Sequence, residues 1–330
     1  MNITGLQYFL VTAEEMNFSR AAQRLFISQQ SLSGSIQRLE KQYGVQLFER
    51  KPVLRLTEAG EQMRQFAQHI LRVERQMSSR MADLSRENTG KLSFGCSRSR
   101  AELFLPDVWE RYHAQLPNID LQVVDGIAAT FDPMLHSGAI DLYIGVDPPE
   151  SVQTLHTSLS EERQYCIMTL SFLQKQMPDR WQSFLRQARQ SGVDLLDICD
   201  FPFILLSPSN RFRISLDYYF SSMGIVPRVV FESNIHSLIY TLSTRSHGVG
   251  IISQMYLYQP LLRAGGRPED LLLLPLKQDL GTHHIKLVYR GDRPLPRYTQ
   301  AFADTIRTTF LEYNQAIGSI ISGMLRELPV

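Results

Sequence analysis

The chain has 330 residues, of which 43% are hydrophobic and 20% are charged, and its formal net charge is +1 at pH 7. This length is enough for two or three domains with cores of their own. The near-neutral charge excludes a histone-like protein that coats nucleic acid through a basic surface. The N-terminus has no basic segment followed by an apolar run, and no stretch reaches the roughly 20 apolar residues of a membrane span. We therefore expect a cytoplasmic protein without membrane contacts.

The first 57 residues are more basic than the chain as a whole, with seven Lys and Arg against four Glu. A first amphipathic helix is predicted by apolar residues at helical spacing, namely Leu6, Phe9, Leu10 and Ala13. Ser19 is a suitable N-cap for a second, short helix, which carries Ala21, Ala22 and Leu25.

The residues after Ser28, a second N-cap, predict a third helix with two different faces. One face is apolar and is formed by Leu32, Ile36 and Leu39. The other carries uncharged amides and hydroxyls, which can hydrogen-bond to base edges in a DNA major groove. Two helices joined by a short turn also occur in proteins that do not bind DNA, so both interpretations stay open here. The residues that would face DNA are Ser28, Gln29, Gln30, Ser33 and Gln37.

Residues 44–57, GVQLFERKPVLRLT, predict two short strands around a turn at Lys51-Pro52, which is the pattern of a wing. Its basic residues, Arg50, Lys51 and Arg55, are suited to contacts with DNA phosphates.

Residues 4–62 resemble the winged helix-turn-helix of the LysR-type transcriptional regulators. The matching segments are FSRAAQRLFISQQSLS, IQRLEKQYGVQLFER and LRLTEAGE, in the order and spacing of that family. The resemblance implies a regulator rather than an enzyme, without a metal or cofactor, that binds double-stranded DNA, with RNA polymerase as a candidate partner. There are two departures. Gly34 stands where the family usually has a long polar or basic residue, and the wing between Arg50 and Leu56 is slightly short. Both bear on which DNA sequence is preferred.

Residues 58–85 predict one long helix, with Thr57 as its cap and Glu58 in its first turn, where the helix dipole favours an acid. Its apolar residues recur every three or four positions, close to a heptad seam, at Met63, Phe66, Ile70, Val73, Met77, Met81 and Leu84. Such a seam predicts pairing with a second copy of the helix, and the alternative is packing on the chain's own body. In the resembled family this helix is the dimer linker. We therefore divide the chain into a DNA-binding domain (1–57), a linker helix (58–89) and a regulatory domain (90–330).

The regulatory domain alternates strand and helix patterns, which indicates an α/β fold with parallel strands. Strands are predicted in KLSFGCS, IDLQVVD, IDLYIGV, FPFILLS, PRVVFES, GVGIISQ and HIKLVYR, and a closing helix over 297–316. The segments MLHSGAIDLYIG and RSHGVGIIS resemble the two-lobed effector domain of the same family, which is similar to periplasmic binding proteins. The resemblance implies a first lobe of about 90–165 and 268–316, a second of about 166–267, and a homodimer or homotetramer.

Two segments exceed the family pattern. Residues 170–200 are longer than usual. The tail, residues 317–330, adds apolar residues at helical spacing, and its simplest interpretation is an extra self-association surface.

A ligand would bind outside the carboxyl ends of the strands. After the first strand, residues 97–100 combine hydroxyls, guanidinium groups and a helix start, which suits an anion, although they could merely cap the helix. In the resembled family, effectors contact this loop. The expected effector residues are Ser97, Arg98, Ser99, Arg100, Thr130, Asp147, Ser207, Ser209, Asn210, Ser233, Asn234 and Gly248. Asp147 is the only acid among them and could instead select an amine. Because the helix start and the two arginines, Arg98 and Arg100, outnumber it, we expect a small carboxylate or another anion.

Motifs of catalysis are missing from the sequence: it contains no GxSxG, no GxxxxGKS or GxxxxGKT, and no HExxH. The adjacent His283 and His284 would point to opposite faces of a strand, which argues against a metal site. The three cysteines lack CxxC spacing, so we expect buried thiols, with redox sensing through Cys96 as an alternative. The alternative function is a small-molecule-binding or enzymatic α/β protein whose helix-turn-helix serves protein contacts.

Overall fold

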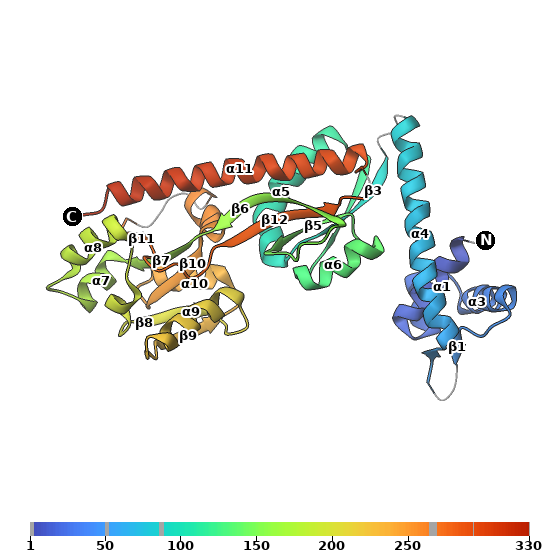
Figure 1. Ribbon diagram of the computed structural model, residues 1–330, viewed down its shortest axis with the longest axis horizontal. Helices are drawn as coiled ribbons and strands as arrows, with labels where there is room; N and C mark the ends of the chain where they lie inside the picture. The colour runs from blue at the N-terminus through green and yellow to red at the C-terminus, as the bar shows by residue number, and fades with distance from the viewer. Residues whose placement is uncertain (1–2, 50–52, 86–88, 264–268, 293, 330) are drawn as a thin grey trace.

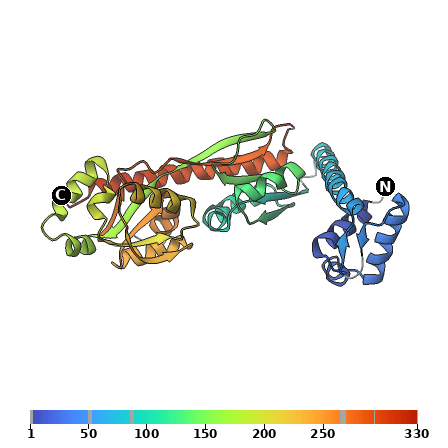
Figure 2. The same ribbon diagram turned by 60° about the horizontal axis from the view of Figure 1, so that its bottom comes forward.

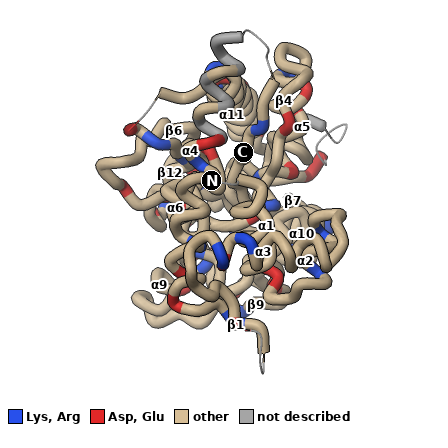
Figure 3. The backbone as a smooth tube through the Cα atoms, turned by 90° about the vertical axis from the view of Figure 1, so that its right-hand side faces the viewer, with Lys and Arg blue, Asp and Glu red and all other residues tan. Residues whose placement is uncertain are grey.

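The computed structural model describes residues 3–49, 53–85, 89–263, 269–292 and 294–329. It contains an N-terminal winged helical domain, one long helix and two α/β lobes, so the predicted fold class is confirmed (Figure 1). Basic and acidic residues are interspersed along this described part of the chain (Figure 3).

The N-terminal domain has three helices, α1 (Ile3–Glu15), α2 (Phe18–Arg24) and α3 (Gln29–Tyr43). The wing strands β1 (Phe48–Glu49) and β2 (Arg55–Leu56) follow and pair antiparallel. The apolar faces of the helices meet in one core, in which Leu6, Phe9, Leu32, Ile36 and Leu39 are buried. The amphipathic pattern therefore folds as predicted.

The two helix caps differ in how well the sequence predicted them. Ser28 caps α3, since its Oγ accepts a hydrogen bond from the Ser31 amide at 3.2 Å. The cap of α2 is Asn17, whose Oδ1 accepts from the amides of Ser19 and Arg20 at 2.9 and 3.0 Å. The prediction that Ser19 caps this helix is wrong, and its hydroxyl is available to another partner.

The wing is fixed to the end of α3 by side-chain hydrogen bonds. Glu40 Oε1 accepts from the amides of Leu47 and Phe48 at 2.9 and 3.4 Å. Between Glu40 and Leu47 the chain turns at Gly44, whose φ of 72° is a left-handed conformation that glycine adopts without steric cost. Thr57 Oγ1 donates to the Gln46 carbonyl at 2.7 Å. These bonds couple the position of the wing to that of α3.

The long helix α4 (Glu58–Ser85) begins as predicted, because Thr57 Oγ1 accepts from the Gly60 amide at 2.9 Å. Its first half contributes the buried Ala67 to the N-terminal core. Phe66, Val73, Met77 and Met81 lie on one stripe and are 62%, 48%, 56% and 54% exposed. The side chain of Leu84 lies outside the described residues.

Lobe one is built on a five-stranded sheet in the order β4-β3-β5-β12-β6. Its elements are β3 (Gly90–Gly95), α5 (Arg98–Gln115), β4 (Ile119–Val124), α6 (Ala128–Ser137), β5 (Leu142–Val146), β6 (Thr154–Glu162) and β12 (His283–Arg290). Strand β3 pairs parallel with β4 and β5, as predicted, and β12 pairs antiparallel with β5 and β6. The sequence patterns did not predict β6.

Lobe two has a second five-stranded sheet in the order β11-β7-β10-β8-β9. Its strands are β7 (Gln164–Thr169), β8 (Pro202–Leu206), β9 (Arg228–Ser233), β10 (Val249–Ser253) and β11 (Leu271–Pro275). Its helices are α7 (Leu170–Gln176), α8 (Trp181–Ser191), η1 (Leu195–Ile198), α9 (Arg211–Ser222), α10 (His236–Thr244), η2 (Gln254–Leu257) and η3 (Gln259–Arg263). Because β11 belongs to this sheet, lobe two extends beyond residue 267 and lobe one resumes only at β12. The additional segment 170–200 supplies Phe172, Phe184, Leu185 and Ile198 to the core of lobe two.

One helix, α11 (Arg297–Arg326), runs along both lobes (Figures 1 and 2). Its first half packs Phe302, Ile306 and Phe310 into the core of lobe one. Its second half buries Ile317 and Ile321 against the sheet of lobe two. The tail predicted to begin at residue 317 therefore continues the closing helix. Interpreting it as a self-association surface is wrong, because the chain's own second lobe covers its apolar side chains.

Candidate functional site

The polar face of α3 is open to solvent. Gln29, Gln30 and Gln37 are exposed and Ser33 is half-buried, while the apolar face points into the core. Ser28 is exposed, but its oxygen already serves as the cap of α3. This arrangement leaves the amides as the groups best able to reach another molecule.

Gln29 is held in place by a residue of the preceding helix. Ser19 Oγ donates a hydrogen bond to Gln29 Oε1 at 2.9 Å. The sequence pattern did not reveal this contact, because Ser19 was interpreted as a cap.

The wing presents one of the three predicted phosphate contacts. Arg55 lies on β2 opposite Glu49 and is exposed. Arg50 and Lys51 lie outside the described residues. At Gly34, a Cβ atom would meet only Arg38 Nη1 at 3.8 Å, an ordinary contact, so crowding does not explain the glycine.

A cleft of about 530 Å³ lies between the two lobes. Strand ends of both lobes meet there, as the strand-end argument predicted. The predicted effector residues that line it are Ser97, Ser99, Arg100, Ser209, Asn210 and Asn234. Residues that were not predicted also line it, among them Glu162, Gln164, Arg211, His236, Ser253, Tyr256 and His283.

The other predicted effector residues are not among those lining the cleft. Arg98 is on a different side of α5 and pairs with Glu102 at 2.9 Å. Gly248 is buried with so little room that a Cβ would lie 2.6 Å from the Pro202 carbonyl oxygen. Ser233 Oγ accepts from the Ile235 amide at 3.1 Å, as part of the turn before α10. Ser207 uses its carbonyl in the turn that leads to α9. Thr130 is exposed on α6.

Asp147 borders the cleft without lining it. Its carboxylate accepts from His283 Nδ1 at 2.6 Å and from the His284 amide at 2.8 Å, and it lies 3.6 Å from Arg211. Burial would raise the pKa of Asp147, but the hydrogen bonds from His284 and His283 lower it overall. This acid is therefore engaged by protein partners.

The cationic groups of the cleft are neutralised more fully than the sequence suggested. Arg100 Nη2 lies 3.2 Å from Glu162 Oε1, and the two side chains are 15% and 9% exposed. Burial alone would lower the pKa of Arg100, but Glu162 raises it, so Arg100 stays charged. The first amide of α5, that of Arg98, donates to Asp125 Oδ1 at 2.8 Å. Two arginines do line the cleft, but the second is Arg211 and not Arg98 as expected. Each lies near an acid, Arg100 near Glu162, which was missed, and Arg211 near Asp147, so the cations do not outnumber the acids.

Buried polar atoms without a partner gather in this cleft. Some buried side-chain nitrogens and oxygens in the described part of the chain make no hydrogen bond. Most of them belong to residues that line the cleft. They are Arg100 Nε, both amide atoms of Gln164, Ser253 Oγ, His236 Nδ1 and His283 Nε2. Folded proteins seldom leave buried polar atoms unpaired, so this concentration indicates a ligand site.

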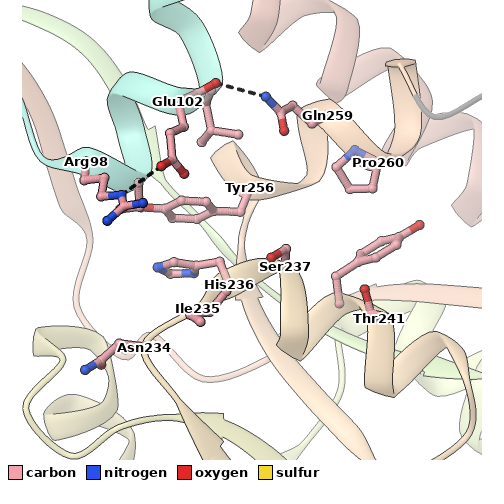
Figure 4. Close-up of a pocket in the computed structure, with 13 residues that line it drawn as sticks. Arg98, Glu102, Asn234, Ile235, His236, Ser237, Thr241, Tyr256, Gln259 and Pro260 are labelled. Carbon is pink, nitrogen blue, oxygen red and sulfur yellow. Dashed lines mark hydrogen bonds and ion pairs between the residues drawn. The ribbon is translucent and has the colours of Figure 1, made fainter.

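A second cavity, of about 1020 Å³, adjoins the cleft between α5 and α10 (Figure 4). The two share a wall in which the rings of His236 and Tyr256 stack at 3.4 Å, and Ser99 Oγ lies 3.0 Å from Tyr256 Oη. Burial, and then the charge of Arg100, lowers the pKa of His236 to about 3. This histidine is neutral at physiological pH.

All three cysteines are free thiols, and Cys199 is only half-buried, so the expectation of buried thiols is wrong for Cys199. Cys96 and Cys166 are fully buried, and burial raises the pKa of Cys96 to about 12. A thiol with this pKa is a poor redox sensor, which disfavours the alternative considered for Cys96.

Among the helices of the described residues, none combines the length and the apolar composition of a membrane span.

A winged helix with an amide-rich face, joined to two lobes around a polar cleft, defines a DNA-binding protein with a ligand-binding domain. A family model described as "Bacterial regulatory helix-turn-helix protein, lysR family" matches residues 3–61, and one described as "LysR substrate binding domain" matches residues 85–311. The chain belongs to the LysR family of DNA-binding transcriptional regulators.

Relatives agree with this assignment, and solved structures share the fold. The HTH-type transcriptional regulator IlvR of Caulobacter vibrioides is 28% identical over 303 residues, which is 90% of this chain and 94% of IlvR. CysB of Haemophilus influenzae is 27% identical over 259 residues, 77% of this chain and 76% of CysB. A full-length OxyR variant from Pseudomonas aeruginosa has a similar fold, with a TM-score of 0.62 and 22% identity. The match covers 93% of this chain and 98% of that one. CbnR in complex with its target DNA also has a similar fold, with a TM-score of 0.57 and 20% identity. The match covers 94% of this chain and 100% of the CbnR chain.

Proposed function

We propose that this regulator binds a two-fold-related DNA site and that a small molecule in the interlobe cleft modulates this binding. For DNA, the proposed base contacts are Gln29, Gln30, Ser33 and Gln37, with Ser28 at the start of the helix. Arg55 is the proposed phosphate contact, together with Arg50 and Lys51. The exposure of the amides on α3 supports this assignment.

We further propose that two copies pair through α4. Its exposed apolar stripe supports this, since an unpaired stripe of large side chains marks an interaction surface. Two paired copies would present two recognition helices to related half-sites. The regulatory domains would then pair into a tetramer, and RNA polymerase is the proposed downstream partner.

The observation that carries the ligand proposal is the set of unpaired polar atoms in the cleft. Among them, the only atom of a permanently charged group is Arg100 Nε, a hydrogen-bond donor on a cation. We therefore propose a small anion, most simply a carboxylate, beside Arg100. Gln164 and Ser253 offer further donors and acceptors, so this acid would carry a second polar group such as a hydroxyl or an amine.

A thermal-shift screen of small metabolites on the full chain tests this proposal, because a ligand that binds the folded state raises the unfolding temperature. We expect hits dominated by small polar acids, and their stabilisation should be much weaker in Gln164→Leu. Hits should also change the affinity of the chain for a DNA site selected from a random pool. Hits that stabilise Gln164→Leu as much as the parent would contradict the cleft assignment. Hits dominated by amines or apolar compounds would contradict the charge assignment alone.

A further inference from the structure

The contact between Ser19 and Gln29 gives the Gln29 amide a direction. Ser19 Oγ donates to Oε1 at 2.9 Å, so the oxygen of this amide is aimed at α2. Asn17 provides the cap of α2, which leaves the Ser19 hydroxyl free for this role. Oε1 keeps a second lone pair, but this oxygen is the end turned toward α2; the other end of the amide is Nε2, which carries two hydrogens and can only donate.

The next residue provides an internal comparison. Gln30 is also exposed on the first turn of α3, but among the described residues no hydrogen bond holds its side chain. Its amide can rotate and present oxygen, nitrogen or both. The two neighbouring glutamines therefore differ in what they can offer, although their chemistry is the same.

We infer that Ser19 is a positioning residue that turns Gln29 into a hydrogen-bond donor toward DNA. Gln29 then recognises a keto oxygen in the major groove, either O6 of guanine or O4 of thymine. It does not accept from the exocyclic amino group of adenine or cytosine. This inference rests on the proposed placement of Gln29 against DNA.

The geometry of base recognition explains the discrimination. A glutamine reads adenine by accepting from N6 with its oxygen and donating to N7 with its nitrogen, so both amide atoms must face the base. In this protein Oε1 faces α2, so that pose requires the oxygen either to turn away from Ser19 or to divide its two lone pairs between Ser19 and the base. An exocyclic amino group placed against Nε2 would set two donors against each other and leave both unsatisfied in the interface.

The test uses full-length protein and duplexes selected from a random pool. Comparing the sites selected by the parent and by Gln29→Ala identifies the base pair that Gln29 reads. Analogues then remove the group in question at that pair: 2-aminopurine lacks the O6 of guanine, 5-methyl-2-pyrimidinone lacks the O4 of thymine and keeps its methyl group, and unsubstituted purine lacks the adenine amino group. Each affinity is measured in the parent and in Gln29→Ala, so the difference isolates the contact made by Gln29.

We expect that loss of the keto oxygen weakens binding by the parent at least about fivefold and leaves Gln29→Ala unaffected. Loss of the amino group should leave the difference between parent and Gln29→Ala unchanged. In Ser19→Ala the preference for the keto group should fall, and Ser19→Thr, which keeps the hydroxyl, should restore it. Preferences at the base pair read by Gln30 should be the same in all Ser19 variants. Because these are ratios within one protein, a general loss of affinity cancels.

Three results separate the possible failures. If Gln29→Ala selects the same sites as the parent, Gln29 does not read a base and the proposed function of α3 is wrong. If Gln29 reads a base but its contact depends on an amino group, the inference about its direction is wrong while the proposed function stands. If Ser19→Ala keeps the full keto preference, Ser19 does not position Gln29.

Discussion

The guanidinium of Arg100 and the carboxylate of Glu162 form an ion pair at 3.2 Å in the wall of the interlobe cleft, with Arg100 on α5 and Glu162 at the end of β6. Both side chains are largely buried. Arg100→Ala would leave Glu162 without its cation, which for a buried pair costs about 3 kcal/mol of unfolding free energy. Arg98→Ala, two residues away in an exposed and solvent-screened pair, should leave the unfolding free energy nearly unchanged. Urea unfolding at pH 7 measures both, and equal losses would show that the pair does not stabilise the fold.

His236 should make the stability of the protein depend on pH. Its pKa is lowered from 6.5 to about 3, so the unfolded chain takes up the proton first as the pH falls. The stability is therefore kept above pH 6.5 and lost progressively between pH 6.5 and pH 3. From pH 7 to pH 5 this one residue should account for a loss of about 2 kcal/mol. His236→Phe keeps an aromatic ring against Tyr256 but cannot take up a proton. Its unfolding free energy, measured in urea at pH 7 and at pH 5, should therefore fall by about 2 kcal/mol less than that of the parent. An identical loss in parent and variant would refute the prediction.

The apolar stripe of α4 should control self-association. Phe66→Glu combined with Met77→Glu places charges on side chains that are 62% and 56% exposed, so the fold of one copy should tolerate them. We expect the parent to be at least dimeric and the double variant to shift toward monomer in analytical ultracentrifugation at micromolar concentration. Gln62→Glu with Gln65→Glu adds the same charge to exposed positions of α4 and serves as the control. A monomeric parent, or an unchanged double variant, would contradict pairing through this stripe.

Two apolar residues on one helix should differ in their effect on stability. Ile321 is 5% exposed against lobe two, whereas Leu311 is 58% exposed on the same helix. Ile321→Ala should cost about 2–4 kcal/mol through lost burial and a cavity, and Leu311→Ala less than about 0.5 kcal/mol. Chemical denaturation reports both. A negligible cost at Ile321 would mean that the second half of α11 does not pack on lobe two in solution.

Arg55 and Gln37 should weaken DNA binding in different ways. Removing a phosphate contact lowers affinity for every sequence and reduces the slope of log affinity against log salt by about one unit. We therefore expect Arg55→Ala to flatten the salt dependence, while Gln37→Ala keeps the parental slope and loses affinity only for the selected site. Fluorescence anisotropy over a range of salt concentrations separates the two effects. If log affinity falls with log salt as steeply in Arg55→Ala as in the parent, Arg55 does not contact a phosphate.

Local periodicity predicted the parts of the fold that depend on nearby residues. The two faces of α3 follow from the spacing of Leu32, Ile36 and Leu39, because helical faces repeat every 3.6 residues. The length of α4 follows in the same way from the spacing of its apolar stripe. The exposed amides of α3 could be predicted for the same reason.

The cleft could be predicted only in part, because its composition depends on pairing between distant strands. Gln164 begins β7, a strand that the sequence patterns did not predict, and it lies opposite Ser253 through the register of β7 and β10. Glu162 closes β6, which was also missed. Arg98 and Arg100 are two residues apart on one helix and point to different sides, and only the packing of α5 decides which one lines the cleft. The direction of the Gln29 amide depends likewise on how α2 crosses α3.

The path of α11 along both lobes has a consequence for biosynthesis. The sheet face of lobe two that contains Ile167, Ile252 and Leu273 is covered by Ile317 and Ile321, which are translated after every strand of both lobes. A domain generally folds as a unit while the chain emerges, but this one cannot bury that face until α11 has left the ribosome. The N-terminal domain is complete long before then. A nascent chain of this regulator therefore carries a finished DNA-binding domain together with an open apolar surface, which is when it most needs a chaperone.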